Sequence, residues 1–229
     1  MKTIGLLGGM SWESSVEYER LINTEVRRRL GGTHSADLLI RSYDFATVEE
    51  LQERDDWDAA AELLATDAAR LEAAGAELVV LCTNTMHRVA PAIEAAITVP
   101  FLHIADATAV AIQQAGLQRV ALLGTRYTME QAFYRGRLAA RGLDIRIPDE
   151  AERDMVHAVI FDELVRGEVR EESRRRYLTV IERMVAAGAE GVIAGCTEIE
   201  LLVPPAAVPY PYFPTTALHA QAAVEAALT

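Results

Sequence analysis

The two cysteines of this chain stand in similar surroundings. Cys82 closes the apolar run 78–81 and Cys196 closes the run 191–195, and a threonine follows each of them. A thiolate on one face of a carbon atom and a thiol on the other can remove a proton and return one to the opposite face, which inverts a stereocentre. Each cysteine falls between an expected strand and an expected helix, where free N–H groups lower the pKa of a thiol. We therefore predict that the pair forms one two-base device that works in both directions.

The alternative for each cysteine taken alone is a small buried hydrophobic residue, which is the commoner role. The matched Cys-Thr contexts favour the catalytic interpretation. Two cysteines are too few for a disulfide scaffold. No C-x-x-C or H-x-x-x-H spacing occurs, so no metal site is predicted.

Small polar residues follow both cysteines. Thr83, Asn84 and Thr85 come after Cys82, and Thr197 comes after Cys196. Their hydroxyl, amide and backbone N–H groups suit a carboxylate. The same residue types also cap helices, and the two roles can coexist.

Short apolar strands alternate with helical patterns along the whole chain. We expect strands at 3–7, 37–42, 78–81, 100–104, 119–123, 144–147, 191–194 and 208–212. Helices are expected at 12–29, 56–74, 86–96, 106–115, 128–141, 151–166, 171–187 and 215–228. This alternation predicts an α/β fold, with mostly parallel, doubly wound sheets covered on both faces.

Three pairs of segments recur in the same order. Residues 4–8 match 120–124 at an offset of 116, residues 73–77 match 186–190 at an offset of 113, and the cysteines are 114 apart. We therefore predict two pseudo-symmetric domains, residues 1–98 with 214–229 and residues 99–213. Because ligands of parallel sheets bind at the carboxyl ends of the strands, the active site is expected in a cleft between the domains. Thr125, which follows strand 119–123, is expected beside Cys196.

Composition excludes several classes of partner. The net charge is 22 − 34 = −12, which argues against binding nucleic acid or an anionic membrane. No apolar run reaches the 18 or so residues that span a bilayer, and the amino terminus does not read as a signal peptide. We expect a cytoplasmic protein.

Four segments carry a resemblance to a known family. They are Ile4-Gly-Leu-Leu-Gly-Gly-Met-Ser-Trp-Glu-Ser, Cys82-Thr-Asn-Thr-Met-His, Leu122-Leu-Gly-Thr-Arg-Tyr-Thr-Met and Gly195-Cys-Thr-Glu-Ile. In these segments the chain resembles the cofactor-independent Asp/Glu racemase superfamily, and within it the aspartate racemase branch. The resemblance implies two α/β domains, a cysteine pair as acid and base, a small amino acid as substrate, no pyridoxal phosphate or other cofactor, and a homodimer.

The resemblance also implies roles for individual residues. Cys82 and Cys196 would be the acid and base, and Asn84 and Thr85 would hold the α-carboxylate. The residues that would line the rest of the substrate site are Thr83, Thr197, Glu198, Met10 and Gln52. Arg166 would stand where some aspartate racemases bind the side-chain carboxylate with a lysine, although it also fits a solvated charge at the end of a helix. No counterpart of a second binding arginine is evident in 44–52, which leaves substrates beyond aspartate and glutamate open.

Two other functions remain open. One is an isomerase or decarboxylase of a related small carboxylic acid, in which a single cysteine acts. The other is a non-catalytic protein that binds a carboxylate. His87, His103 and His157 are expected to be structural more often than functional.

Overall fold

The chain folds into two compact units of the same architecture. A computed structural model describes residues 1–229. The first unit comprises Met1–His103 and His219–Thr229, and the second comprises Ile104–Leu218. Each contains one four-stranded sheet in which all the paired strands are parallel, so the predicted α/β class is confirmed.

The sheet of the first unit has the order β2-β1-β3-β4. Its strands are β1 (Ile4–Gly8), β2 (Leu38–Ser42), β3 (Leu78–Leu81) and β4 (Phe101–Leu102). Its helices are α1 (Trp12–Leu30), α2 (Phe45–Glu53), α3 (Trp57–Ala73), the 3₁₀ helix η1 (Thr85–Val89), α4 (Ala90–Ala96) and most of α11 (Thr215–Leu228). The sequence-based boundary assigned 100–104 to the second domain, whereas β4 pairs with β3 and completes this first sheet.

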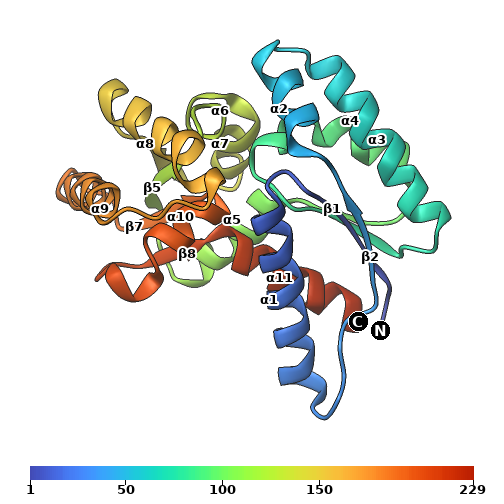
Figure 1. The fold of residues 1–229 in the computed structure, drawn as a ribbon. Helices are drawn as coiled ribbons and strands as arrows, with labels where there is room; N and C mark the ends of the chain where they lie inside the picture. Colours follow the sequence, from blue (N-terminus) through green and yellow to red (C-terminus); the bar gives the residue numbers. More distant parts are fainter. The chain divides into compact units, whose positions relative to one another are not determined.

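Helices cover both faces of the first sheet (Figure 1). Because side chains alternate along a strand, Ile4 and Leu6 face the helices α1 and α11, with which they share one core cluster. Gly5, between them, faces α3: a Cβ there would meet Leu71 at 3.3 Å and Ala76. The backbone N–H of Lys2 donates to the carbonyl of Ala227, which joins the start of the chain to the end of α11.

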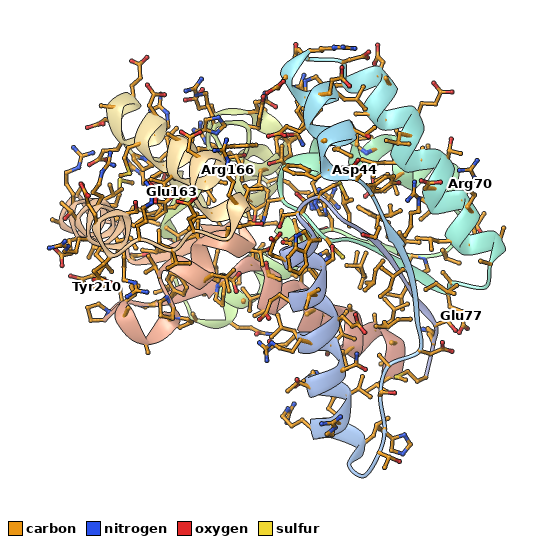
Figure 2. All side chains as sticks on the ribbon, in the orientation of Figure 1. Asp44, Arg70, Glu77, Glu163, Arg166 and Tyr210 are labelled. Atoms are coloured by element: carbon orange, nitrogen blue, oxygen red, sulfur yellow. The ribbon has the colours of Figure 1, made fainter.

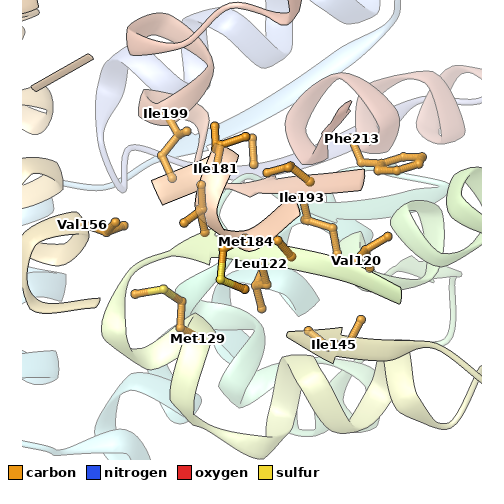
Figure 3. Close-up of a cluster of buried hydrophobic side chains, with 14 of the residues drawn as sticks. Val120, Leu122, Met129, Ile145, Val156, Ile181, Met184, Ile193, Ile199 and Phe213 are labelled. Carbon is orange, nitrogen blue, oxygen red and sulfur yellow. The ribbon is translucent and has the colours of Figure 1, made fainter. Parts of the chain in front are cut away.

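The second unit repeats this order as β6-β5-β7-β8. Its strands are β5 (Arg119–Gly124), β6 (Asp144–Arg146), β7 (Gly191–Gly195) and β8 (Tyr212–Pro214). Its helices are α5 (Ile104–Gln114), α6 (Arg126–Glu130), α7 (Ala132–Ala139), α8 (Glu150–Asp162), η2 (Leu164–Arg166), α9 (Glu171–Ala186), α10 (Thr197–Leu202) and η3 (Pro205–Ala207). Figure 3 shows its buried core, in which strand residues such as Val120 and Ile193 meet Ile181 and Met184 of α9.

Several expected helices differ in detail. Helix α2 was not expected, because only its cap, where Asp44 accepts from the N–H of Ala46, marks its start. The helix expected at 86–96 is divided at Ala90, where α4 begins, since Pro91 in the first turn of α4 has no N–H to continue the preceding helix. The helix expected at 128–141 is interrupted at Gln131, whose backbone is extended. No helix is both long enough and apolar enough to cross a bilayer.

Candidate active site

Cys82 lies in the core of the first unit. It continues the alternation of Leu78 and Val80 and packs in the same cluster, with Tyr18 of α1. It is 1% exposed, and burial raises the pKa of its thiol well above the ordinary value. The pKa lowering predicted from a following helix is wrong for this cysteine, because the next helix is the five-residue 3₁₀ turn η1 and the thiol is desolvated.

Strand register identifies the true counterpart of Cys196. In the first sheet Leu7 pairs with Leu81, and in the second Leu123 pairs with Ala194. Leu7 and Leu123 are equivalent in the repeat, since 123 − 7 = 116. Leu81 is therefore equivalent to Ala194, and two residues further on Thr83 is equivalent to Cys196 (196 − 83 = 113). The 114-residue spacing of the cysteines matches residue types but is one position out of register.

Cys196 is the more accessible thiol. It follows β7 at the carboxyl edge of the second sheet and is half-buried. Its Sγ donates to Oε2 of Glu198 at 2.8 Å, and Glu198 is itself buried. Desolvation first, and then the negative charge of Glu198, raise the pKa of Cys196 well above the ordinary value. The predicted lowering is wrong here as well, because α10 is short and carries two acidic residues in its first turn.

The other predicted residues of the first unit surround the turn after β3. Thr83 is half-buried, and its N–H donates to the carbonyl of Leu81 at 2.9 Å. Asn84 and Thr85 are buried and begin η1. Gln52 of α2 is brought to the same turn, because its Nε2 donates to the sulfur of Met86 at 3.0 Å.

Met10 follows β1 and is buried. The glycine before it, Gly9, has a φ of 82°, and a Cβ there would collide with the backbone of Tyr43. Only glycine fits this close approach, so the path of the chain into Met10 depends on it.

In the second unit, Thr125 and Cys196 follow the paired residues Gly124 and Gly195 of neighbouring strands. The Thr125 hydroxyl caps α6 by accepting from the N–H of Thr128. Thr197 is buried, and its hydroxyl lies 2.8 Å from that of Thr216.

Arg166 lies at the end of η2 (Figure 2), which is separated in the sequence from the other predicted site residues. Its side chain is exposed, and its guanidinium forms no ion pair, whereas Glu163 at the start of the same turn bonds Arg170 and Ser173.

Sequence reasoning missed a buried cluster of histidines beside the turn. His87 and His103 have ring centroids 4.4 Å apart, and His219 of α11 lies 5.8 Å from His87. All three are buried. The sequence of α11 carries no signal that separates His219 from other polar residues of that helix, such as Gln221 and Glu225. His157 belongs to the second unit, where its Nδ1 accepts from the backbone N–H of Arg126 at 3.2 Å.

The two parallel α/β units carry thiol, carboxyl and hydroxyl groups at the carboxyl ends of their strands, where side chains can exchange protons with a bound ligand. Comparison with known proteins makes the class definite. The family model for Asp/Glu/Hydantoin racemase matches residues 7–223. The chain therefore belongs to the Asp/Glu/Hydantoin racemase family and is an enzyme of the isomerase class.

Solved structures agree with this assignment. A protein from Yersinia pestis, described as a "putative Asp/Glu Racemase", is 52% identical, with a TM-score of 0.94 and complete coverage of both chains. An aspartate racemase homologue from Pyrococcus horikoshii OT3 is 32% identical, with a TM-score of 0.85 and again complete coverage of both. The aspartate racemase of Picrophilus torridus is 18% identical over 99% of this chain and 94% of its own, with a TM-score of 0.79, and so shares the fold.

Proposed function

We propose that this enzyme interconverts the L and D forms of a small amino acid without a cofactor, and that Cys196 and Thr83 are its two proton-transfer groups. The observation that carries the assignment is the strand register, which makes these two residues equivalent. Cys196 removes the proton from one face of Cα, and Thr83 supplies one to the other face. Both are half-buried, whereas Cys82, the partner predicted from the sequence, is enclosed in the core.

Glu198 controls the basicity of the thiol. The Cys196 sulfur donates to its carboxylate oxygen at 2.8 Å, which fixes the direction of the thiol proton. Burial and the charge of Glu198 raise the pKa of Cys196, so the thiolate, once formed, is a stronger base towards the Cα proton.

We assign an acidic side chain to the preferred substrate. The observation that supports an acidic substrate is Arg166, whose exposed guanidinium has no carboxylate partner although the net charge of the chain is −12. Most other arginines of the second unit form ion pairs. The substrate α-carboxylate is assigned to Asn84 and Thr85, as the resemblance implied. In an Arg166→Gln variant the KM for aspartate and glutamate rises, while that for alanine changes little. Arg175→Gln, on the exposed face of α9, is the matched control.

The decisive experiment follows a panel of amino acids in D₂O, reading inversion by chiral chromatography and exchange by mass spectrometry. The wild type inverts at least one amino acid and places solvent deuterium at Cα of the product. Cys196→Ala and Thr83→Ala each lower kcat by about 10²- to 10⁴-fold, the usual contribution of a proton-transfer group. Full activity in Cys196→Ala refutes the assignment of that residue, and full activity in Thr83→Ala refutes the assignment of the second group.

The burial of Cys82 in the core also favours a second candidate function. With Cys82 in the core, one thiol remains at the strand ends, which suits a decarboxylase or isomerase in which a single cysteine protonates a carbanion. Release of CO₂ from a substituted malonate, with no inversion of any amino acid, identifies this chemistry. Stoichiometric binding of a carboxylate with neither exchange nor product would instead identify a binding protein.

A further inference from the structure

The carbonyl oxygen of Thr83 is held by a side chain. Nδ1 of His87 lies 2.7 Å from it. A carbonyl oxygen can only accept, so Nδ1 carries the proton and donates. On the other side of the same residue, the N–H of Thr83 donates to the carbonyl of Leu81. Both backbone polar groups of Thr83 are thus fixed, and with them the origin of its side chain.

Local backbone structure does not supply this bond. In η1 the N–H of His87 donates to the carbonyl of Asn84 at 3.1 Å, one residue beyond Thr83. In the second unit the equivalent carbonyl, that of Cys196, accepts from the backbone N–H of Ile199 at 3.1 Å. In the second unit a backbone N–H three residues further on thus satisfies this carbonyl, whereas in the first unit the imidazole of His87 does so. A fully buried carbonyl without a partner costs about 1–3 kcal/mol, and the half-buried carbonyl of Thr83 would bear part of that cost without the imidazole.

The ring of His87 is itself tightly constrained. Its centroid lies 4.4 Å from that of His103 and 5.6 Å from that of Phe101. His219 closes the cluster, with Nε2 2.8 Å from the carbonyl of Leu102 and Nδ1 2.8 Å from the hydroxyl of Tyr18. Because the carbonyl of Leu102 accepts, Nε2 of His219 donates and its Nδ1 accepts from Tyr18. The cluster therefore ties the Thr83 turn to β4, α1 and α11.

We infer that His87 is a positioning residue for the reaction, which holds Thr83 at the geometry that proton delivery to Cα requires. This inference rests on the proposed function, in which Thr83 is one of the two proton-transfer groups. Proton transfer is sensitive to displacement: an error of about 1 Å can lower the rate about 10²-fold. His87 acts through the backbone of Thr83, so its loss affects the chemical step more than substrate binding.

The test compares His87→Leu, which cannot donate, with His87→Asn, whose amide nitrogen can occupy the position of Nδ1. His87→Leu is expected to lower kcat by about 10- to 100-fold while KM changes less than about threefold, and His87→Asn is expected to recover most of the loss. Tyr18→Phe is the matched control, because it removes a buried hydrogen bond of the same cluster without touching Thr83. It should lower the melting temperature and leave kcat unchanged.

A second readout does not depend on turnover. Amide hydrogen exchange of peptides covering residues 82–90 should accelerate in His87→Leu, and should stay near wild-type rates in His87→Asn and Tyr18→Phe. Wild-type exchange and wild-type kcat in His87→Leu would overturn the inference. An equal loss of kcat in Tyr18→Phe would also overturn it, because the effect would then be general destabilisation. If the wild type converts no amino acid, the proposed function fails, and the exchange rates alone decide whether His87 anchors the turn.

Discussion

Replacing Cys82 by alanine separates a packing role from a catalytic one. The side chain is 1% exposed and packs against Val80 and Tyr18, so the change removes one heavy atom from an apolar core. Deletions of one methyl-sized group in a core cost roughly 0.5–1.5 kcal/mol. In a chain of this size that corresponds to a fall of about 1–6 °C in melting temperature. Because the thiol is enclosed in the core cluster, kcat per folded molecule should remain within about twofold of the wild type.

The assay pairs thermal unfolding with initial rates of inversion at saturating substrate. Cys196→Ala is the comparison, with the opposite expected pattern: a small change in melting temperature and a loss of kcat of at least about 10²-fold. If Cys82→Ala instead unfolds at the wild-type temperature and loses activity as severely as Cys196→Ala, the register argument is wrong and the cysteine pair predicted from the sequence is the catalytic pair.

Three further outcomes follow from the structure. Burial lowers the pKa of His219 to about 4, so between pH 6.5 and 4 the unfolded chain binds a proton that the folded chain does not. The free energy of unfolding therefore falls by up to roughly 3 kcal/mol as the pH falls from 6.5 to 4. The melting temperature of His219→Gln should depend less on pH than that of the wild type, and an unchanged dependence contradicts this. Glu198→Gln removes a charge that raises the pKa of Cys196, so alkylation of this thiol by iodoacetamide at pH 8 should accelerate, and an unchanged or slower rate contradicts the coupling. Gly9→Ala should destabilise the fold by more than about 3 kcal/mol in denaturant titrations, since the added methyl group collides with the backbone of Tyr43. A near-wild-type midpoint would contradict this, because it would mean that the backbone there moves to make room for the methyl group.

Much of the fold was predictable because its signals are local. Parallel strands buried on both faces appear as continuous apolar runs, and β1 and β3 lie within a residue or so of the expected ranges. Ser11 and Asp56 accept the N–H groups of their helices as capping residues do. Interruptions within helices were not predicted, because the extended backbone at Gln131 depends on packing that a periodicity in sequence does not report.

The site was only partly predictable, for a physical reason. Pairing the cysteines by residue type assumes that a shared Cys-Thr context means a shared position, but a shift of one residue turns a side chain to the opposite face of a sheet. The sequence held the correcting signal: the repeated segment just before each strand has an offset of 113, and 196 − 113 = 83. The histidine cluster could not be inferred in the same way, because His87, His103 and His219 come from three separated segments that only the folded chain brings together.

The one-residue correction changes the expected chemistry as well as the geometry. Two thiols can exchange the roles of acid and base, which is why the sequence suggested an enzyme working in both directions. A hydroxyl and a thiol differ in acidity, and an unactivated hydroxyl is a weak base. Thr83 therefore suits the delivery of a proton better than its removal, whereas the Cys196 thiol, the more acidic of the two groups, suits removal. The equilibrium between enantiomers stays at unity, so the asymmetry must appear in kinetics: turnover starting from the two enantiomers should differ in kcat, and a Thr83→Cys variant, which restores two thiols at equivalent positions, should bring the two values closer together.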